Sequence, residues 1–148
     1  MSNTIDLFKD EYAFLSNFEP VVVFYDGLEF PSVEHAYQAA KTLDIEKRKL
    51  IQKASTAGKA KRMGNSLMLR PNWDNDRIGV MATLLLQKFE RGSILAQKLL
   101  DTGGAILIEG NWWRDFYWGV CDGIGENHLG KLLMVIRDKL KEAETELL

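Results

Sequence analysis

Cysteine is almost missing from this 148-residue sequence, in which Cys121 stands alone. A lone cysteine excludes an intramolecular disulfide and is typical of proteins that work in a reducing compartment. The N-terminus lacks the basic start and apolar run of a signal peptide, and no stretch approaches the roughly 18 apolar residues that span a bilayer. We therefore expect a cytoplasmic protein that does not enter a membrane.

Histidine is also scarce, since His35 and His128 are the only two and neither has a partner at the spacing of a zinc site. Cys121 has no motif around it that supports a thiol hydrolase. No GxGxxG or Walker-type loop is present, so we expect neither a metal nor a cofactor. The net charge of −2 gives no global attraction to nucleic acid or anionic membranes, so a polyanion would have to bind a local patch. The sequence is silent on oligomeric state.

Local patterns predict one α+β domain over residues 1–148, mostly helical, with a small β component. Apolar runs at 21–25 and 28–30 flank Asp26-Gly27 and predict an N-terminal hairpin. A short buried strand is predicted at 105–109, followed by an aromatic, glycine-rich loop at 110–126. Helices are predicted at 32–43, 44–54, 56–63 (stopped by Gly64), 76–89, from a Ser93 cap to before Gly103, and onwards from an Asn127 cap.

One face of the helix predicted at 32–43 carries polar side chains. Glu34, Gln38 and Lys41 are spaced i, i+4 and i+7 and span about 10 Å of helix rise. Glu34 lies in the first turn, where the backbone N–H groups favour a carboxylate. An acid, an amide and an amine in a row fit a sugar with its attached groups, although a solvated face that binds nothing is the alternative. The opposite side is expected to face the core, and it is formed by Val33, Ala36, Tyr37, Ala40 and Leu43.

Aromatic residues crowd the loop that follows the last predicted strand. They are Trp112, Trp113, Phe116, Tyr117 and Trp118, and glycines on both sides favour an exposed or half-exposed loop. Exposed rings are stacking platforms for bases. Asp115 among these rings is expected to be desolvated, which would raise its pKa towards that of a general acid. The alternative is that the rings fill core, which we expect for some of them.

Positive charge is concentrated between residues 47 and 62, where there is no acidic residue. The next helix start, at Thr56-Ala57-Gly58, is a further anion site. Together these features suit the phosphates of a nucleotide or a nucleic-acid strand, and a solvated helical face is the alternative. The seven basic residues are Lys47, Arg48, Lys49, Lys53, Lys59, Lys61 and Arg62.

Several separated blocks of the sequence occur in the order that is typical of one protein family. Residues 14–18 (FLSNF), 31–41 (PSVEHAYQAAK), 115–119 (DFYWG) and 125–137 (GENHLGKLLMVIR) resemble the YbiA/NADAR family, and the similarity runs from about Phe8 to Leu140. The resemblance implies a compact α+β domain that cleaves N-glycosidic bonds. Members act on ribosylated intermediates of riboflavin synthesis or remove ADP-ribose from guanine bases. It also implies a set of substrate-binding residues: Asn17, Phe18, Gln38, Trp73, Lys88, Trp112, Trp118, Gly119 and Asn127.

Cleavage of a ribose–nitrogen bond builds oxocarbenium character at C1′ and negative charge on the departing base. Glu34 is the candidate that stabilises C1′ or activates water, and Asp115 is the candidate acid or sugar-hydroxyl orienter. Lys41 would attack C1′ to give a Schiff base if its pKa is lowered, or else hydrogen-bond the substrate. Trp112 and Trp118 are expected to stack on the base, and no metal is required.

The substrate is expected to be a ribosylated base or ADP-ribosylated nucleic acid. Seven uncompensated cations exceed what one phosphate needs, which favours removal of ADP-ribose from modified guanine. Two alternatives stay open. One is an N-glycosidase of phosphoribosylated riboflavin-pathway intermediates, and the other is a non-catalytic ADP-ribose/NAD-binding module.

Overall fold

A computed structural model describes residues 3–146. Within this range helices predominate and β structure is limited to short strands, which confirms the predicted α+β class. The chain forms two compact units, one made by Asn17–Lys88 and the other by residues 3–16 and 89–146.

A β-hairpin opens the unit made by Asn17–Lys88. Strand β2 (Pro20–Tyr25) pairs antiparallel with β3 (Leu28–Ser32), and Tyr25 lies opposite Leu28. Asp26 and Gly27 both have positive φ, at 52° and 83°, as the tightest hairpin turns require. The predicted hairpin is therefore confirmed.

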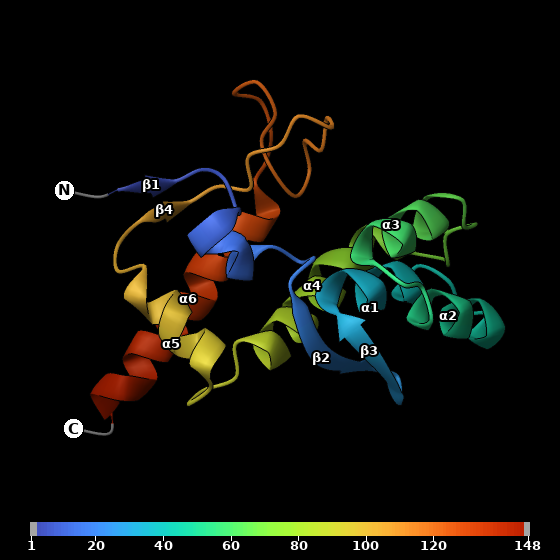
Figure 1. Ribbon diagram of the computed structural model, residues 1–148, viewed down its shortest axis with the longest axis horizontal. Coiled ribbons are helices and arrows are strands. Elements are labelled where there is room, and N and C mark those ends of the chain that lie inside the picture. Colours follow the sequence, from blue (N-terminus) through green and yellow to red (C-terminus); the bar gives the residue numbers. More distant parts are fainter. Residues whose placement is uncertain (1–2, 147–148) are drawn as a thin grey trace. The chain divides into compact units, whose positions relative to one another are not determined.

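Four helices complete this unit: α1 (Val33–Ala40), α2 (Ile45–Gln52), α3 (Ala57–Asn65) and α4 (Trp73–Lys88). The three helices α2, α3 and α4 and both strands all pack against α1, which is therefore the central element of the unit (Figure 1). Ser32, Asp44 and Thr56 cap the first three helices through their side-chain oxygens, and each stands where a helix was predicted to start.

The predicted ends of α1, α2 and α3 were less accurate than their starts, whereas for α4 the start was the less accurate. Helix α1 ends at Ala40, where the backbone carbonyl of Lys41 accepts a 2.7 Å bond from the Arg70 amide. Leu43 consequently lies outside the helix and is 63% exposed, so its assignment to the core was wrong. Gly64 does not stop α3, which continues through it to Asn65. Helix α4 begins three residues earlier than predicted, at Trp73.

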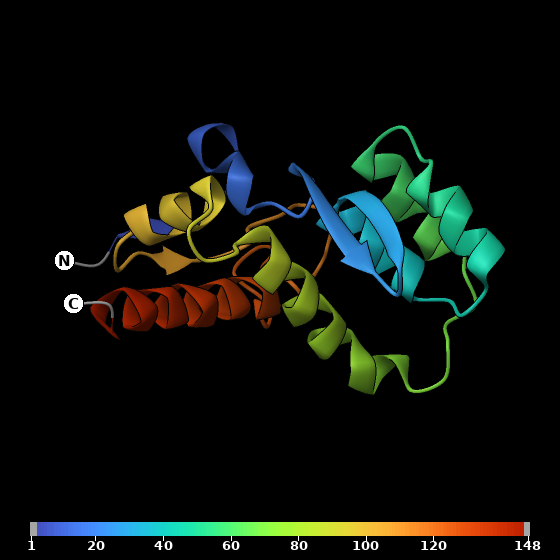
Figure 2. The same cartoon turned by 90° about the horizontal axis from the view of Figure 1, so that it is seen from below.

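The second unit joins the N-terminal segment to the C-terminal half of the chain. Strand β1 (Thr4–Ile5) pairs in parallel with β4 (Ile106–Leu107), which is the predicted strand at 105–109 in shortened form. A 3-10 helix, η1 (Asp10–Leu15), follows β1. Helix α5 (Ile94–Asp101) is capped by Ser93 as predicted, and α6 (His128–Glu146) packs against α5 and β4 (Figure 2).

Candidate active site

The polar face of α1 is buried, so its interpretation as a solvated face was wrong. Glu34 is 7% exposed and Gln38 is 4% exposed. The side-chain amide of Gln38 donates a 2.8 Å hydrogen bond from Nε2 to Oε1 of Glu34. Burial of a carboxylate is costly unless polar partners compensate it, so this pair occupies a position that packing alone would give to apolar residues.

Asn17 lies directly beside Glu34, because its backbone carbonyl accepts a 3.1 Å bond from the Glu34 amide. Its buried side chain donates from Nδ2 to the sulfur of Met81 at 3.5 Å, and sulfur is a weak acceptor. In the part of the chain that the structure describes, the buried Oδ1 of Asn17 has no hydrogen-bond partner. A buried carbonyl oxygen in that state suits a ligand that donates a hydrogen bond, such as a sugar hydroxyl.

Lys41 sits at the C-terminal end of the same helix, half-buried, with Nζ 5.7 Å from the centre of the Tyr37 ring. Tyr37 packs on Trp73 with ring centres 5.3 Å apart. The Arg70 guanidinium lies 5.3 Å from the Trp73 ring, which is itself buried. Trp73 is thus a core residue of this unit with little ring surface exposed, and a substrate contact by Trp73 stays a prediction.

Lys88, in the last turn of α4, combines full burial with a lowered pKa. Its side chain is only 2% exposed. Desolvation lowers the pKa of the amine from 10.5 to about 7, and the negative charge of Glu19 offsets part of this effect. A lysine with that pKa is roughly half neutral at pH 7, which is the state a nucleophilic amine needs. This burial was not predicted from the sequence, although Lys88 follows Leu84 and Leu85 and precedes Phe89.

The aromatic loop belongs to the other unit, and its rings are exposed or half-buried, as predicted for the loop. None of the five rings is buried, so the expectation that some of them fill the core was wrong. Trp112 is 68% exposed, stands edge-on to Trp113 and has the Lys9 amine 4.5 Å from its ring centre. Trp118 is half-buried and packs edge-on against Tyr117, with ring centres 4.9 Å apart. Trp112 therefore offers the more open face for stacking on a base.

The polar groups of this loop hold its backbone in shape. Asp115 accepts through Oδ1 from the amides of Tyr117 (3.2 Å) and Trp118 (2.9 Å), so a general-acid role, which stays a prediction, would fall to Oδ2. A side chain at Gly119 would overlap the backbone carbonyl of Glu109.

Asn127 precedes α6, as predicted for a cap, but its side chain has partners elsewhere. It accepts from the Glu109 amide at 3.0 Å and donates to the Leu107 carbonyl at 2.9 Å. These bonds give Asn127 a structural role in fastening β4 and the start of the loop to the start of α6.

Of the seven cations between residues 47 and 62, six are exposed or half-buried, and Arg48 is buried. Arg48 is buried, forms a 2.8 Å ion pair with Asp26 and donates from Nε to the Thr42 carbonyl. It stabilises the hairpin turn and cannot bind a phosphate. Phe18 is 44% exposed, and the Lys61 amine lies 6.0 Å from its ring centre.

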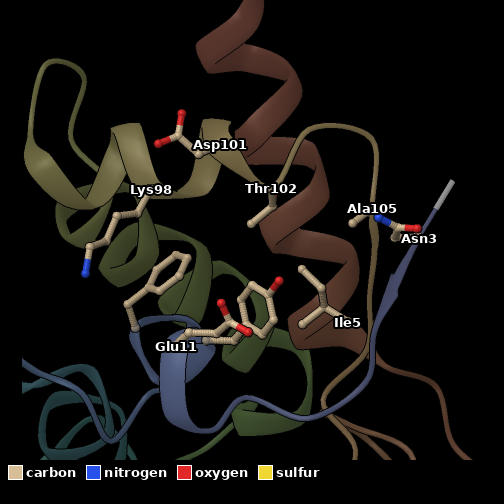
Figure 3. A pocket seen from close by; sticks show the side chains of 9 residues that line it. Asn3, Ile5, Glu11, Lys98, Asp101, Thr102 and Ala105 are labelled. Atoms are coloured by element: carbon tan, nitrogen blue, oxygen red, sulfur yellow. The ribbon is translucent and has the colours of Figure 1, made fainter.

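A surface pocket of about 360 Å³ lies in the unit made by residues 3–16 and 89–146 (Figure 3). None of the candidate residues lines it. The hydroxyl of Thr102 is already used, since it donates to the Leu99 carbonyl and accepts from Arg137. We assign this pocket no role. Its lining residues are Asn3, Ile5, Glu11, Tyr12, Phe14, Lys98, Asp101, Thr102 and Ala105.

Residues 3–146 contain neither a cluster of metal-binding side chains nor a helix suited to a membrane. Nowhere in that range do three or more histidine, cysteine, aspartate or glutamate side chains gather as metal ligands would. The described helices also include none that is both long and apolar enough to cross a membrane.

The candidate residues divide between the two units. Asn17–Lys88 holds Glu34 with its two amide neighbours and both lysines, while the other unit supplies Asp115, Gly119, Asn127 and the tryptophans of the loop. The structure thus defines an α+β protein whose first unit buries a carboxylate and an amine suited to acid–base or nucleophilic chemistry.

The model of the NADAR domain matches residues 6–141, and the chain belongs to that family. It is 40% identical over 135 residues to N-glycosidase YbiA of Escherichia coli, a match that covers 89% of this chain and 84% of the relative. An N-glycosidase of Nostoc punctiforme is 34% identical over 136 residues, covering 88% and 86%.

Other relatives are longer. A riboflavin biosynthesis protein of Vibrio vulnificus is 35% identical over 136 residues, which are 90% of this chain but 37% of that protein.

The NMR structure of E. coli YbiA has the same fold, with a TM-score of 0.84 and 38% identity, over 99% of this chain and 90% of that one.

Proposed function

We propose that this protein hydrolyses the N-glycosidic bond between a ribose C1′ and a base nitrogen. The observation that carries the proposal is the buried Glu34 carboxylate, to which Gln38 donates a hydrogen bond. The backbone of Glu34 is bonded to that of Asn17, whose buried side-chain Oδ1 has no hydrogen-bond partner among the described residues. The relatives named N-glycosidase support the same class of reaction.

The chemistry follows from the charge that develops during cleavage. As the C1′–N bond breaks, C1′ becomes electron-poor and the base nitrogen must take a proton. The Glu34 carboxylate stabilises the positive sugar or removes a proton from the attacking water, whose oxygen bonds to C1′. A hydroxyl of the sugar donates to Oδ1 of Asn17.

In a covalent variant of this mechanism, a lysine amine attacks C1′ in place of water. The neutral amine bonds to C1′ and displaces the base, which departs with one proton of the amine. The C1′–O4′ bond then breaks, the ring oxygen takes the second amine proton, and an imine between C1′ and the lysine nitrogen remains. Water then hydrolyses the imine and returns the lysine. The sequence pointed to Lys41, and the structure adds Lys88, whose pKa is lowered as this step requires. Lys88 is therefore a second candidate for the nucleophile.

For the substrate we favour guanine bases that carry ADP-ribose, in nucleic acid. The exposed ring of Phe18 beside Lys61 supports this choice, since an aromatic face next to cations binds bases and phosphates together. The exposed Lys59 and Arg62 of α3 extend the same charge. We call these four residues the Phe18 surface.

Phosphoribosylated intermediates of riboflavin synthesis are the second candidate substrate. The names of the Vibrio relative and of a chloroplastic riboflavin biosynthesis protein of Zea mays favour it. A module that binds ADP-ribose or NAD without turnover is the third candidate, but binding alone gives no reason to bury Glu34.

Salt dependence separates the two substrates. Each phosphate contact adds to the slope of binding against salt concentration, so ADP-ribosylated DNA should show a steep slope and a phosphoribosyl pyrimidine a shallow one. Changing Lys59, Lys61 and Arg62 together to glutamine should raise KM for the oligonucleotide and flatten its salt dependence, with a smaller effect on kcat.

The matched control removes three exposed cations of the other unit, Lys98, Lys131 and Lys139, and should leave KM unchanged. If the Phe18-surface variant behaves like the parent protein at both salt concentrations, the preference for a nucleic-acid substrate is refuted.

A further inference from the structure

The side-chain amide of Gln38 is enclosed on both sides. Its Nε2 donates to Glu34, and its Oε1 is buried, with no hydrogen-bond partner in the part of the chain that the structure describes. That oxygen faces Gly64 of α3. A Cβ atom at position 64 would overlap Oε1 and lie only 2.6 Å from Cδ of Gln38.

This arrangement explains why the last turn of α3 contains a glycine, Gly64. Glycine is unfavourable inside a helix, and at position 64 a steric contact accounts for it, because any side chain there would collide with Gln38. Gly79 in α4 makes the contrast, because a Cβ added to it would have nothing within 4 Å. The space left by Gly64 is filled by the amide of Gln38.

The same contacts argue against the predicted role of Gln38 in substrate binding. Its donor end is engaged with Glu34, and its acceptor end lies against the backbone of α3. The Gln38 side chain is 4% exposed, and neither its donor nor its acceptor group is open to a substrate. Gln38 can therefore act on the substrate only through Glu34.

We propose that Gln38 is a positioning residue, which fixes the orientation of the Glu34 carboxylate, and that Gly64 provides the space this orientation requires. The inference rests on the proposed function, in which Glu34 acts at C1′. It assigns a role to a residue of α3 that carries no functional group of its own.

The kinetic test compares Gln38→Met, Gly64→Ala and the control Gly79→Ala, using an oligonucleotide with ADP-ribose on guanine. Loss of a hydrogen bond to a charged group should lower kcat about tenfold to a hundredfold. KM should stay nearly constant in both test variants, because neither residue touches the substrate, and Gly79→Ala should match the parent protein. An increase in KM with kcat retained in Gln38→Met would overturn the proposal.

Stability provides a second readout that needs no substrate. Gly64→Ala should lower the melting temperature of the parent protein more than it lowers that of Gln38→Ala, because the shortened side chain removes the clash with Oε1 and Cδ and leaves only the 2.9 Å contact with Cβ. Equal losses in the two backgrounds would show that Gly64 does not accommodate Gln38.

The amide signal of Gln38 in a 15N NMR spectrum tests the hydrogen bond itself. The signal is assigned by its disappearance in Gln38→Met, and it should shift in Glu34→Gln and in Gly64→Ala but not in Gly79→Ala. If the Gln38 amide signal does not shift in Glu34→Gln, the positioning role of Gln38 is refuted. A parent protein that turns over neither substrate would instead refute the proposed function, so the two failures are distinguishable.

Discussion

The buried amine of Lys88 should make the stability of the protein depend on pH in a specific way. Its pKa is lowered from 10.5 to about 7 in the folded chain. Between these values the unfolded chain holds one proton more than the folded one, so this residue makes stability rise with pH over that window. Below pH 7 both states are protonated, and the burial of the charge is at its most costly.

Lys88→Met tests this because methionine fills a similar volume without a charge. Each pH unit in the middle of the window is worth about 1.4 kcal/mol. The free energy of unfolding of the variant minus that of the parent protein should therefore fall by about 2 kcal/mol between pH 7 and pH 9. Urea unfolding at pH 6, 7, 8 and 9, followed by circular dichroism, measures this difference.

Lys47→Met is the matched control, since Lys47 is exposed on α2 and its removal should change stability equally at every pH. Glu19→Gln should enlarge the effect at pH 7, because the charge of Glu19 opposes the lowering of the Lys88 pKa. A difference between Lys88→Met and the parent protein that stays constant from pH 6 to pH 9 would refute the account of this residue.

Two further predictions concern the covalent route and the hairpin turn. Borohydride added during turnover should trap a sugar adduct on the protein, detected by mass spectrometry; loss of trapping in Lys41→Ala or in Lys88→Ala identifies the nucleophile, and no adduct in the parent protein excludes the route. Asp26→Asn should lower the free energy of unfolding by about 1–3 kcal/mol, because it leaves the buried guanidinium of Arg48 without its ion pair while asparagine still tolerates the positive φ. Urea unfolding measures this, and an unchanged stability would mean that the pair contributes nothing.

The parts of the fold that were predictable from the sequence are those that local chemistry determines. Asp26-Gly27 requires positive φ at both positions, and Ser32, Asp44 and Thr56 satisfy the first amides of the helices they precede. These signals lie within a few residues of the structure they specify.

Gly64 and Leu43 show where local signals fail. A glycine after a helical pattern is the usual sign of a helix end, but Gly64 is present because of a side chain on another helix. Leu43 fits the periodicity of α1, yet a bond from Arg70, far along the chain, joins the backbone just after its last turn. The pairing of β1 with β4 is equally non-local.

The helix face that carries Glu34 and Gln38 was predictable from the sequence, but the environment of these residues was not. The spacing of Glu34 and Gln38 put them on one face, whereas their burial depends on the helices and strands that surround α1. Lys88 was assigned by resemblance alone, and only its desolvation in the folded unit marks it as a potential nucleophile.

The most direct test of the central claim is the release of free ADP-ribose from an oligonucleotide modified on guanine, or of free base from a phosphoribosyl pyrimidine, by the parent protein and by Glu34→Gln. The parent protein should turn over at least one of them. Glu34→Gln should lose about a thousandfold or more in kcat with an unchanged melting temperature, because the substitution keeps the shape of the side chain but removes its charge. Near-normal turnover by a folded Glu34→Gln, or no turnover of either substrate by the parent protein, would contradict the account.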